Sequence, residues 1–149
     1  MTNYQFWKAL EETMKEPQND INILKFSERL IEGYEDNDDP KIWCSFTEDK
    51  FGVGTYSQSN LDSPDGKLML CFTRKEYAEK DNRRLRDEGE RNILTKLVSL
   101  KEVMDNMFDQ SNITGLIFNC DDKKHMYLVT KNLLRLIMRS RKEKISNLL

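Results

Sequence analysis

Cys120 and His125 carry side chains that could act as a nucleophile and a general base. They flank a predicted hairpin turn at 121–124, so strand geometry could bring the thiol and the imidazole close together. Such a pair also needs a third group that orients the imidazole, and none is evident in the sequence. His125 is the only histidine, and next to Met126 on an expected strand it is more typical of an edge residue than of a catalyst. We therefore expect a protein that is not an enzyme.

The acidic segment from Glu35 to Pro40 is the second place where residue types and spacing suggest chemistry. Asp36 and Asp38 have the alternate spacing of a calcium loop, but the glycine and the distal glutamate of that motif are missing. We expect a solvated loop whose carboxylates contact a cationic partner. The candidate partner-binding residues are Glu32, Glu35, Asp36, Asp38, Asp39 and, as an aromatic anchor, Trp43.

The sequence predicts neither a cofactor nor a metal site. Gly52 and Gly54 resemble the start of a phosphate loop, but no third glycine follows, and a hairpin explains them. Cys44, Cys71 and Cys120 are odd in number and far apart in the sequence, which favours reduced thiols. With one histidine and no Cys-x-x-Cys, a zinc site has too few ligands.

Charge is distributed unevenly along the chain. Residues 1–75 hold 9 Lys+Arg against 14 Asp+Glu, and residues 76–149 hold 15 against 12. The sequence pI is near 5.6 and no aromatic residues interleave with the basic run, so we do not expect nucleic-acid binding. No apolar run approaches the length of a membrane span and no signal-peptide pattern opens the sequence. A cytoplasmic protein that does not enter the membrane is expected.

Apolar spacing predicts a single α+β domain, 1–149, in which a small mixed or antiparallel sheet of about five to six strands packs with helices. The N-terminal helical pair is expected within 1–34. Its first helix, 4–16, places Phe6, Trp7, Leu10 and Met14 on one stripe. The second begins after 19 or 20 and ends at Gly33, with Ile23, Leu24, Leu30 and Ile31 on one face and Phe26 toward its edge.

A sheet-containing core is expected at 41–138, followed by an exposed basic tail at 139–149. Strands are predicted at 41–46 and 51–56 as a hairpin, at 67–72, at 92–98, and at 115–119 with 125–129. Thr73 with Glu76 and Ser99 with Glu102 have the spacing of capping boxes that start two helices. The charged span 79–90 fits either a helix or an exposed loop. Thr130 is expected to cap a last helix whose apolar face is Leu133, Leu134, Ile137 and Met138.

The order of elements from Lys67 resembles the N-terminal domain of the SseB-like family over roughly residues 67–138. The residues that carry the resemblance are Phe72-Thr73 with Glu76, Ser99-Leu100-Lys-Glu-Val103-Met104, Thr114-Gly115-Leu-Ile-Phe-Asn119, and Leu128-Val-Thr130 leading into Leu133-Leu134. Cys120 departs from the pattern, because family members more often carry proline after the asparagine. The resemblance implies a bacterial, cytosolic, non-enzymatic α+β domain and supplies no active site.

Two functions are consistent with these observations. The first is a protein-interaction module, an adaptor or an immunity-type protein, that binds a basic toxin or another cationic surface through its acidic segment, since complementary charge speeds association. The alternative is a small-molecule-binding regulatory domain of SseB-like type, with a pocket between the sheet and the helices. The oligomeric state stays open.

Overall fold

The computed structural model describes residues 2–35, 39–48, 54–56, 66–87, 89, 93–120 and 125–148. Within these ranges the chain alternates helices and strands, which confirms the predicted α+β class. The elements in chain order are α1 (Asn3–Met14), α2 (Asp20–Glu35), β1 (Lys41–Glu48), β2 (Gly54–Tyr56), β3 (Lys67–Cys71), α3 (Lys75–Asp87), β4 (Ile93–Ser99), α4 (Leu100–Asp109), β5 (Ile113–Phe118), β6 (Tyr127–Thr130) and α5 (Lys131–Leu148).

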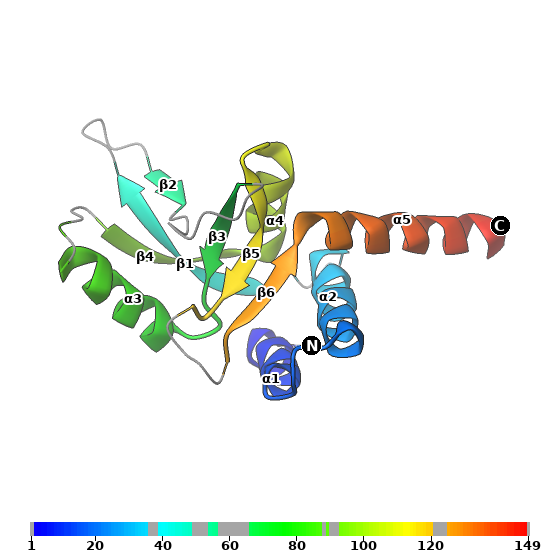
Figure 1. Ribbon diagram of the computed structural model, residues 1–149, viewed down its shortest axis with the longest axis horizontal. Helices are drawn as coiled ribbons and strands as arrows, with labels where there is room; N and C mark the ends of the chain where they lie inside the picture. The colour runs from blue at the N-terminus through cyan, green and yellow to red at the C-terminus, as the bar shows by residue number, and fades with distance from the viewer. Residues whose placement is uncertain are drawn as a thin grey trace.

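Two three-stranded sheets form the centre of the molecule (Figure 1). In the first sheet β1 pairs antiparallel with both β2 and β4. In the second, β5 pairs parallel with β3 and antiparallel with β6. The sheets meet where Trp43 of β1 and Phe72, just after β3, exchange two backbone hydrogen bonds of 3.0 and 2.9 Å. The predicted hairpin of β1 with 51–56 is present as β2, while residues 49–53 lie outside the described ranges.

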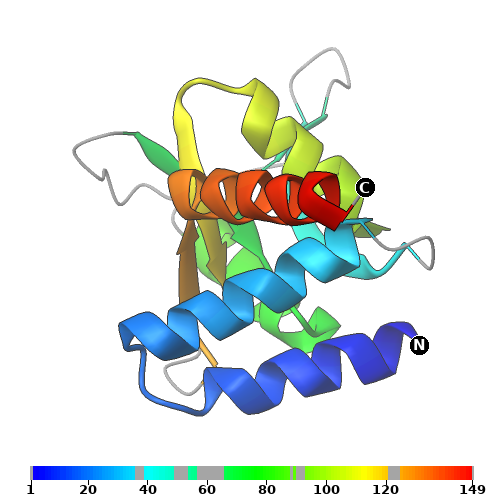
Figure 2. The same ribbon diagram turned by 90° about the vertical axis from the view of Figure 1, so that its right-hand side faces the viewer.

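Helices cover both faces of the second sheet. Alternate residues of its strands point to opposite sides, so each face packs its own set of apolar side chains. Met69 and Leu116 join α1, α2, α4 and α5 in the main core. Leu68 and Ile117 point the other way and pack with Ala78 of α3. Figure 2 shows α5 lying between α4 and α2, with α1 beyond α2.

The first helix follows its predicted stripe. Thr2 and Gln5 form a capping box at its start, with hydrogen bonds of 3.2 and 2.9 Å. Trp7, Leu10 and Met14 are buried as predicted. The N-terminal segment is therefore part of the core.

The buried face of α2 is rotated from the predicted one. Phe26 is fully buried, and its ring stacks on that of Tyr127 of β6 with 4.3 Å between the ring centres. Leu24, in contrast, is 41% exposed. At 3.6 residues per turn, Leu24 lies about 140° around the helix from the centre of the face that holds Phe26 and Leu30. Leu24 is therefore a surface residue.

Gly33 does not end α2, which continues to Glu35. A Cβ at Gly33 would overlap the ring of Phe6 and come within 3.2 Å of Cγ of Pro40. The glycine is needed for the close approach of α2 to Phe6, and the predicted role as a C-terminal stop is wrong.

The charged span 79–90 is helical as far as Asp87. The buried amide of Asn82 accepts a hydrogen bond from Ser45 of β1 at 2.5 Å and donates one to Thr95 of β4. Polar side chains therefore attach α3 to the first sheet, and this is why the span shows little apolar periodicity.

Ser99 and Thr130 cap helices as predicted. Ser99 Oγ accepts from the backbone N–H of Glu102 at 3.4 Å at the start of α4. Thr130 Oγ1 accepts from the backbone N–H of Leu133 at 3.3 Å at the start of α5. These local signals act as the sequence indicates.

Thr73 does not cap α3, so the first predicted capping box is wrong. The helix begins at Lys75, one residue too late for Thr73 to occupy the capping position. The Thr73 hydroxyl instead donates to Oε1 of Glu11 on α1 at 2.8 Å. A residue predicted to act locally thus forms a contact between distant segments.

The last helix includes most of the predicted basic tail. Leu134 and Ile137 are buried near its start, and the later turns project past the rest of the molecule (Figure 1). No helix in the described part of the chain has the length and the hydropathy to cross a membrane.

Candidate functional site

Carboxylates from α4 and from Asp39, two residues before β1, gather on one surface. Glu102, Asp105 and Asp109 follow one another at spacings of three and four, which places them on one side of α4. With Asp39 they line an open groove whose remaining lining residues are Ser99, Lys101 and Asn106. We call the surface formed by Asp39, Glu102, Asp105 and Asp109 the acidic face. Lys101 is the one cation among the described residues that line it, and it forms an exposed ion pair of 3.4 Å with Asp105.

Asp39 is fixed to the start of α4. Its Oδ1 accepts a hydrogen bond of 2.5 Å from the Ser99 hydroxyl, and the backbone N–H of Leu100 donates to the carbonyl of Pro40 at 2.8 Å. Asp39 has a φ of 48°, a left-handed conformation that aspartate adopts more readily than most residues. The predicted partner-binding residue Asp39 is therefore held beside Glu102.

Asp105 is tied to the end of α2. The Tyr34 hydroxyl donates to Asp105 Oδ1 at 2.5 Å, and Lys101 Nζ lies 4.8 Å from the centre of the Tyr34 ring. Burial, and then the hydrogen bond to Asp105, raise the pKa of Tyr34 to about 12. The phenol therefore stays protonated at neutral pH and holds one carboxylate of the acidic face in place.

The other predicted partner-binding residues lie in different surroundings. Glu32 is exposed on α2, and Asp36 and Asp38 lie outside the described residues. Glu35 forms an ion pair of 3.0 Å with Arg141 of α5. Because both side chains are more than a third exposed, this pair adds little stability, but it partly neutralises Glu35.

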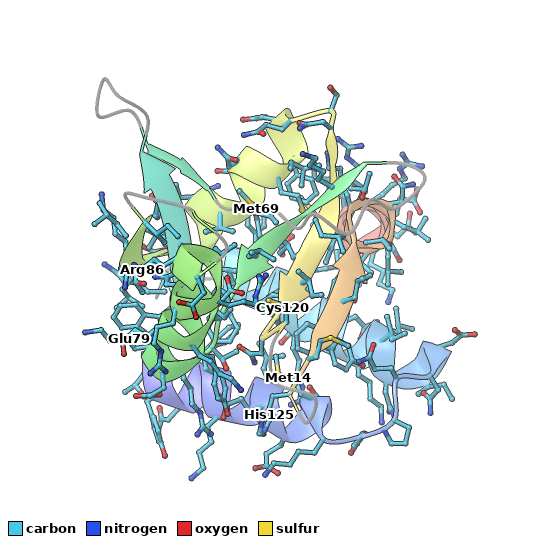
Figure 3. The ribbon with its side chains drawn as sticks, turned by 60° about the vertical axis from the view of Figure 1, so that its left-hand side comes forward. Met14, Met69, Glu79, Arg86, Cys120 and His125 are labelled. Carbon is cyan, nitrogen blue, oxygen red and sulfur yellow. The ribbon has the colours of Figure 1, made fainter. Side chains whose placement is uncertain are left out.

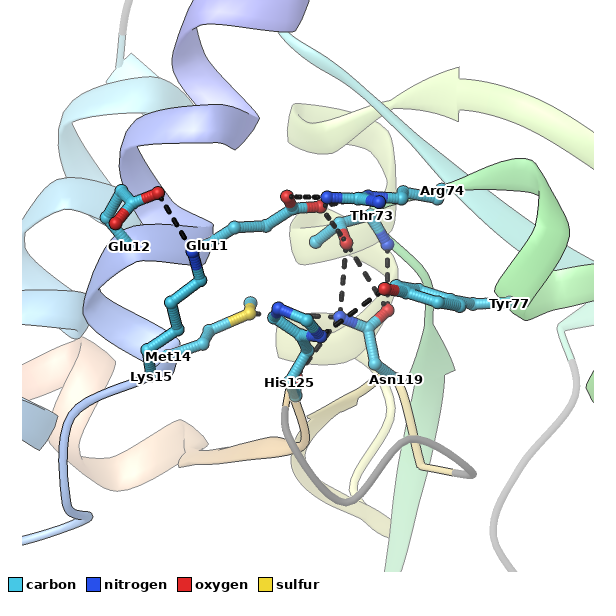
Figure 4. A network of polar contacts seen from close by, with 9 residues as sticks. All are labelled: Glu11, Glu12, Met14, Lys15, Thr73, Arg74, Tyr77, Asn119 and His125. Atoms are coloured by element: carbon cyan, nitrogen blue, oxygen red, sulfur yellow. Dashed lines mark hydrogen bonds and ion pairs between the residues drawn. The ribbon is translucent and has the colours of Figure 1, made fainter.

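A second polar cluster lies where the parallel strands β3 and β5 end (Figure 4). Arg74 donates to both carboxylate oxygens of Glu11, at 3.0 and 2.7 Å. The side-chain amide of Asn119 accepts from the backbone N–H of Thr73 at 3.0 Å and donates to the carbonyl of His125 at 3.1 Å. We call Glu11, Thr73, Arg74, Asn119 and His125 the Glu11 cluster.

The Glu11 cluster is built to hold elements together. Burial alone would raise the pKa of Glu11, but the hydrogen bonds from Arg74 and Thr73 outweigh it and hold that pKa below its usual value. The carboxylate is therefore ionised, and it accepts three hydrogen bonds, one from Thr73 and two from Arg74. It joins α1 to the start of α3 and is poorly suited to proton transfer.

Cys120 and His125 do not form a nucleophilic pair. The His125 ring stacks against Tyr77, with Nδ1 3.3 Å from the Tyr77 hydroxyl. The Cys120 thiol instead donates to Asp81 at 3.6 Å. Figure 3 labels both residues.

Trp43 lies away from the acidic face, beside a groove along α1. It is half-buried, and Lys75 Nζ lies 5.7 Å from its ring centre. The groove has a volume of about 850 Å³ and passes Trp7, Glu11 and Arg74. Trp43 and Asp39, both predicted to bind a partner, therefore line different grooves.

Cys44 and Cys71 are neighbours in space although they are far apart in the sequence. Cys44 follows Trp43 and Cys71 precedes Phe72 at the bridge between the sheets, both are fully buried, and their thiols are hydrogen-bonded. That bond, together with burial, raises the pKa of the Cys44 thiol. All three cysteines are free, as predicted. The described residues include no group of three or more His, Cys, Asp or Glu side chains placed to hold a metal ion.

Comparisons with protein-family models, with curated proteins and with solved structures gave no match. The resemblance to the SseB-like family therefore rests on the residues quoted above and stays a hypothesis.

Sequence reasoning missed two carboxylates of the acidic face. It assigned Glu102 to a helix cap and did not consider Asp105 or Asp109. Their spacing along α4 was the available signal, because it predicts one charged side of a helix. Asp39 lies beside them because β1 pairs with β4 as far as Ser99. The sequence did not indicate this pairing.

Proposed function

We propose that this protein is a non-enzymatic binding module that recognises a basic surface of a partner protein through its acidic face. Asp39, Glu102, Asp105 and Asp109 line one open groove, and this is the observation that carries the proposal. Concentrated charge of one sign accelerates association with a surface of opposite sign and disfavours other partners. An adaptor and an immunity-type protein that binds a basic toxin would both use such a surface.

Two carboxylates of the acidic face are fixed in place by hydrogen bonds, which supports this function. Asp39 is bonded to Ser99, and Asp105 is bonded to Tyr34. Side chains fixed before binding lose less conformational freedom when a partner docks. The groove is open and shallow, which fits a protein surface better than a small molecule.

A small-molecule site is less well supported by the groove along α1. Its buried polar groups, Glu11 and Thr73, bond to each other and to Arg74. A ligand site usually presents converging polar groups to the ligand. Here those groups stabilise the attachment of α1.

Affinity capture from an extract of the source cell, with three forms of the protein as bait, tests the proposal. The first form is the wild type. The second replaces the acidic face isosterically with Asp39→Asn, Glu102→Gln, Asp105→Asn and Asp109→Asn. The matched control removes four exposed carboxylates elsewhere, with Glu12→Gln, Glu16→Gln, Glu76→Gln and Asp87→Asn.

We expect a protein that binds the wild type and the control, that is lost from the acidic-face variant, and that elutes as salt is raised. Circular dichroism and thermal unfolding check that all three forms are folded. Equal capture by the acidic-face variant would contradict the proposal.

A further inference from the structure

The end of α5 is an amphipathic helix that extends beyond the surface that covers its start. Leu134 and Ile137 are buried, whereas Ile145 is 58% exposed and Leu148 is 86% exposed. At 3.6 residues per turn these four side chains lie on one stripe of the helix. Apolar side chains therefore recur on this stripe beyond Arg141, where the helix extends past the body of the protein (Figure 1).

The projecting end carries a charge opposite to that of the acidic face. Arg139, Lys142 and Lys144 are exposed there, and Glu143 is the one acidic residue between 139 and 148. The same chain thus presents a basic helix and an acidic groove. Charge complementarity of this kind favours contact between copies.

One end of the acidic face lies beside the start of α5, because Asp109 and Arg135 line the same groove. Arg135 donates to the backbone carbonyl of Phe108 on α4 at 3.3 Å. On the other side, Arg141 pairs with Glu35 at the end of α2. Figure 2 shows α5 between these two helices, with its C-terminal end toward the viewer.

We infer that two copies of this chain associate about a twofold axis, with the projecting end of α5 in each copy lying across the acidic face of the other. In an antiparallel pair of α5 helices, each end meets the start of the other helix, where Asp109 of the acidic face lies. The contact is self-complementary, as a twofold interface requires, and it forms twice. This inference rests on the proposed function, because it names a second copy as the partner.

A second copy fits these surfaces better than a lipid bilayer does. A bilayer with anionic headgroups attracts the basic end of α5, but it repels the carboxylate of Asp109 beside the start of the same helix. A second copy pairs the basic end of α5 with the carboxylates of the acidic face in one contact.

Size-exclusion chromatography with light scattering tests the inference on the full chain. One variant reverses the helix charge with Lys142→Glu and Lys144→Glu. A second reverses the acidic face with Glu102→Lys and Asp109→Lys. The matched control reverses two exposed charges on α3 with Lys80→Glu and Arg83→Glu.

We expect the wild type and the control to be dimers. Each reversed variant alone should be a monomer, with a dimer dissociation constant raised about tenfold or more. Mixing the two reversed variants should restore a dimer, because each helix then meets a face of opposite charge. This rescue also shows that neither variant failed to fold.

A monomeric wild type, or a dimer that both reversals leave intact, would overturn the inference. Sedimentation of a monomeric wild type with phosphatidylserine vesicles would also overturn it and would identify a lipid surface as the partner of α5. If the wild type is monomeric while capture still depends on the acidic face, this inference fails and the proposed function stands. If capture does not depend on the acidic face, the proposed function fails as well.

Discussion

Arg74 donates two hydrogen bonds to the carboxylate of Glu11, at 3.0 Å from Nε and 2.7 Å from Nη2. The pair joins the first helix to the residues between β3 and α3, 63 positions along the chain. Glu11 is 7% exposed, so its charge depends on this partner. The groove along α1 therefore owes its polar character to folding contacts, and this separates it from the acidic face.

Replacing Glu11 with Gln should lower the free energy of unfolding by about 1.5–3 kcal/mol, because hydrogen bonds to a buried charge are lost. Because the Arg74 side chain is 50% exposed, solvent weakens the ion pair, and we expect a loss in the lower part of that range. Urea denaturation measures the change. Glu12→Gln is the control, since its ion pair with Lys15 is exposed, and it should change stability by less than about 0.5 kcal/mol. Equal losses in the two variants would contradict the structural role of Glu11.

The same carboxylate predicts a pH dependence of stability. The pKa of Glu11 in the folded protein lies below the usual value of 4.5, so its contribution is fully present above about pH 4.5 and is lost as the pH falls through the lowered pKa. The stability difference between the wild type and Glu11→Gln should therefore shrink on acidification. Denaturation curves from neutral pH to pH 3 test this. A difference that stays constant over this range would show that the pKa of Glu11 is not lowered by folding.

Thr73→Asp separates the observed role of Thr73 from helix capping. Aspartate is a helix cap as good as threonine, so a capping residue would tolerate the change. In the Glu11 cluster the new carboxylate would lie beside that of Glu11, and we expect a loss of about 2 kcal/mol or more, as for other unpaired buried charges. Thr73→Ser keeps the hydroxyl and should retain most of the stability. Chemical denaturation of the three forms decides between the two roles, and a stable Thr73→Asp protein would favour the cap.

Gly33→Ala tests the packing of α1 against α2. Alanine has the higher helix propensity by about 1 kcal/mol, so the change would stabilise an unconstrained helix. Here the added Cβ overlaps the Phe6 ring, and we expect a net loss of about 1–3 kcal/mol. The double variant Gly33→Ala with Phe6→Leu should recover part of that loss. If Gly33→Ala raises the thermal midpoint instead, the close approach of the two helices is not as described.

Local signals in the sequence predicted most of the fold. The stripe of α1, the caps at Ser99 and Thr130, and the strand at 115–119 depend on neighbouring residues, which a sequence displays directly. The failures concern contacts between distant segments. Thr73 has the type and spacing of a cap, but Glu11 and Asn119 compete for its polar groups.

The candidate site was predictable only in part for the same reason. Asp39 was identified from the acidic run. Glu102, Asp105 and Asp109 join it through the pairing of β1 with β4, which brings Asp39 to Ser99. Trp43 belongs to the other groove because strand alternation directs it toward Lys75 of α3.

Chemical-shift mapping of the isotope-labelled protein with a basic helical peptide tests the central claim most directly. A peptide with the sequence of residues 131–148 is the probe, and the Lys142→Glu, Lys144→Glu variant is the labelled protein, so that its own helix does not compete. The account predicts shifts at Asp39 and along 99–109, weakened by added salt. Shifts confined to the groove along α1 would contradict the assignment of the acidic face as the binding surface, whereas no shifts at all would overturn the inferred contact with α5.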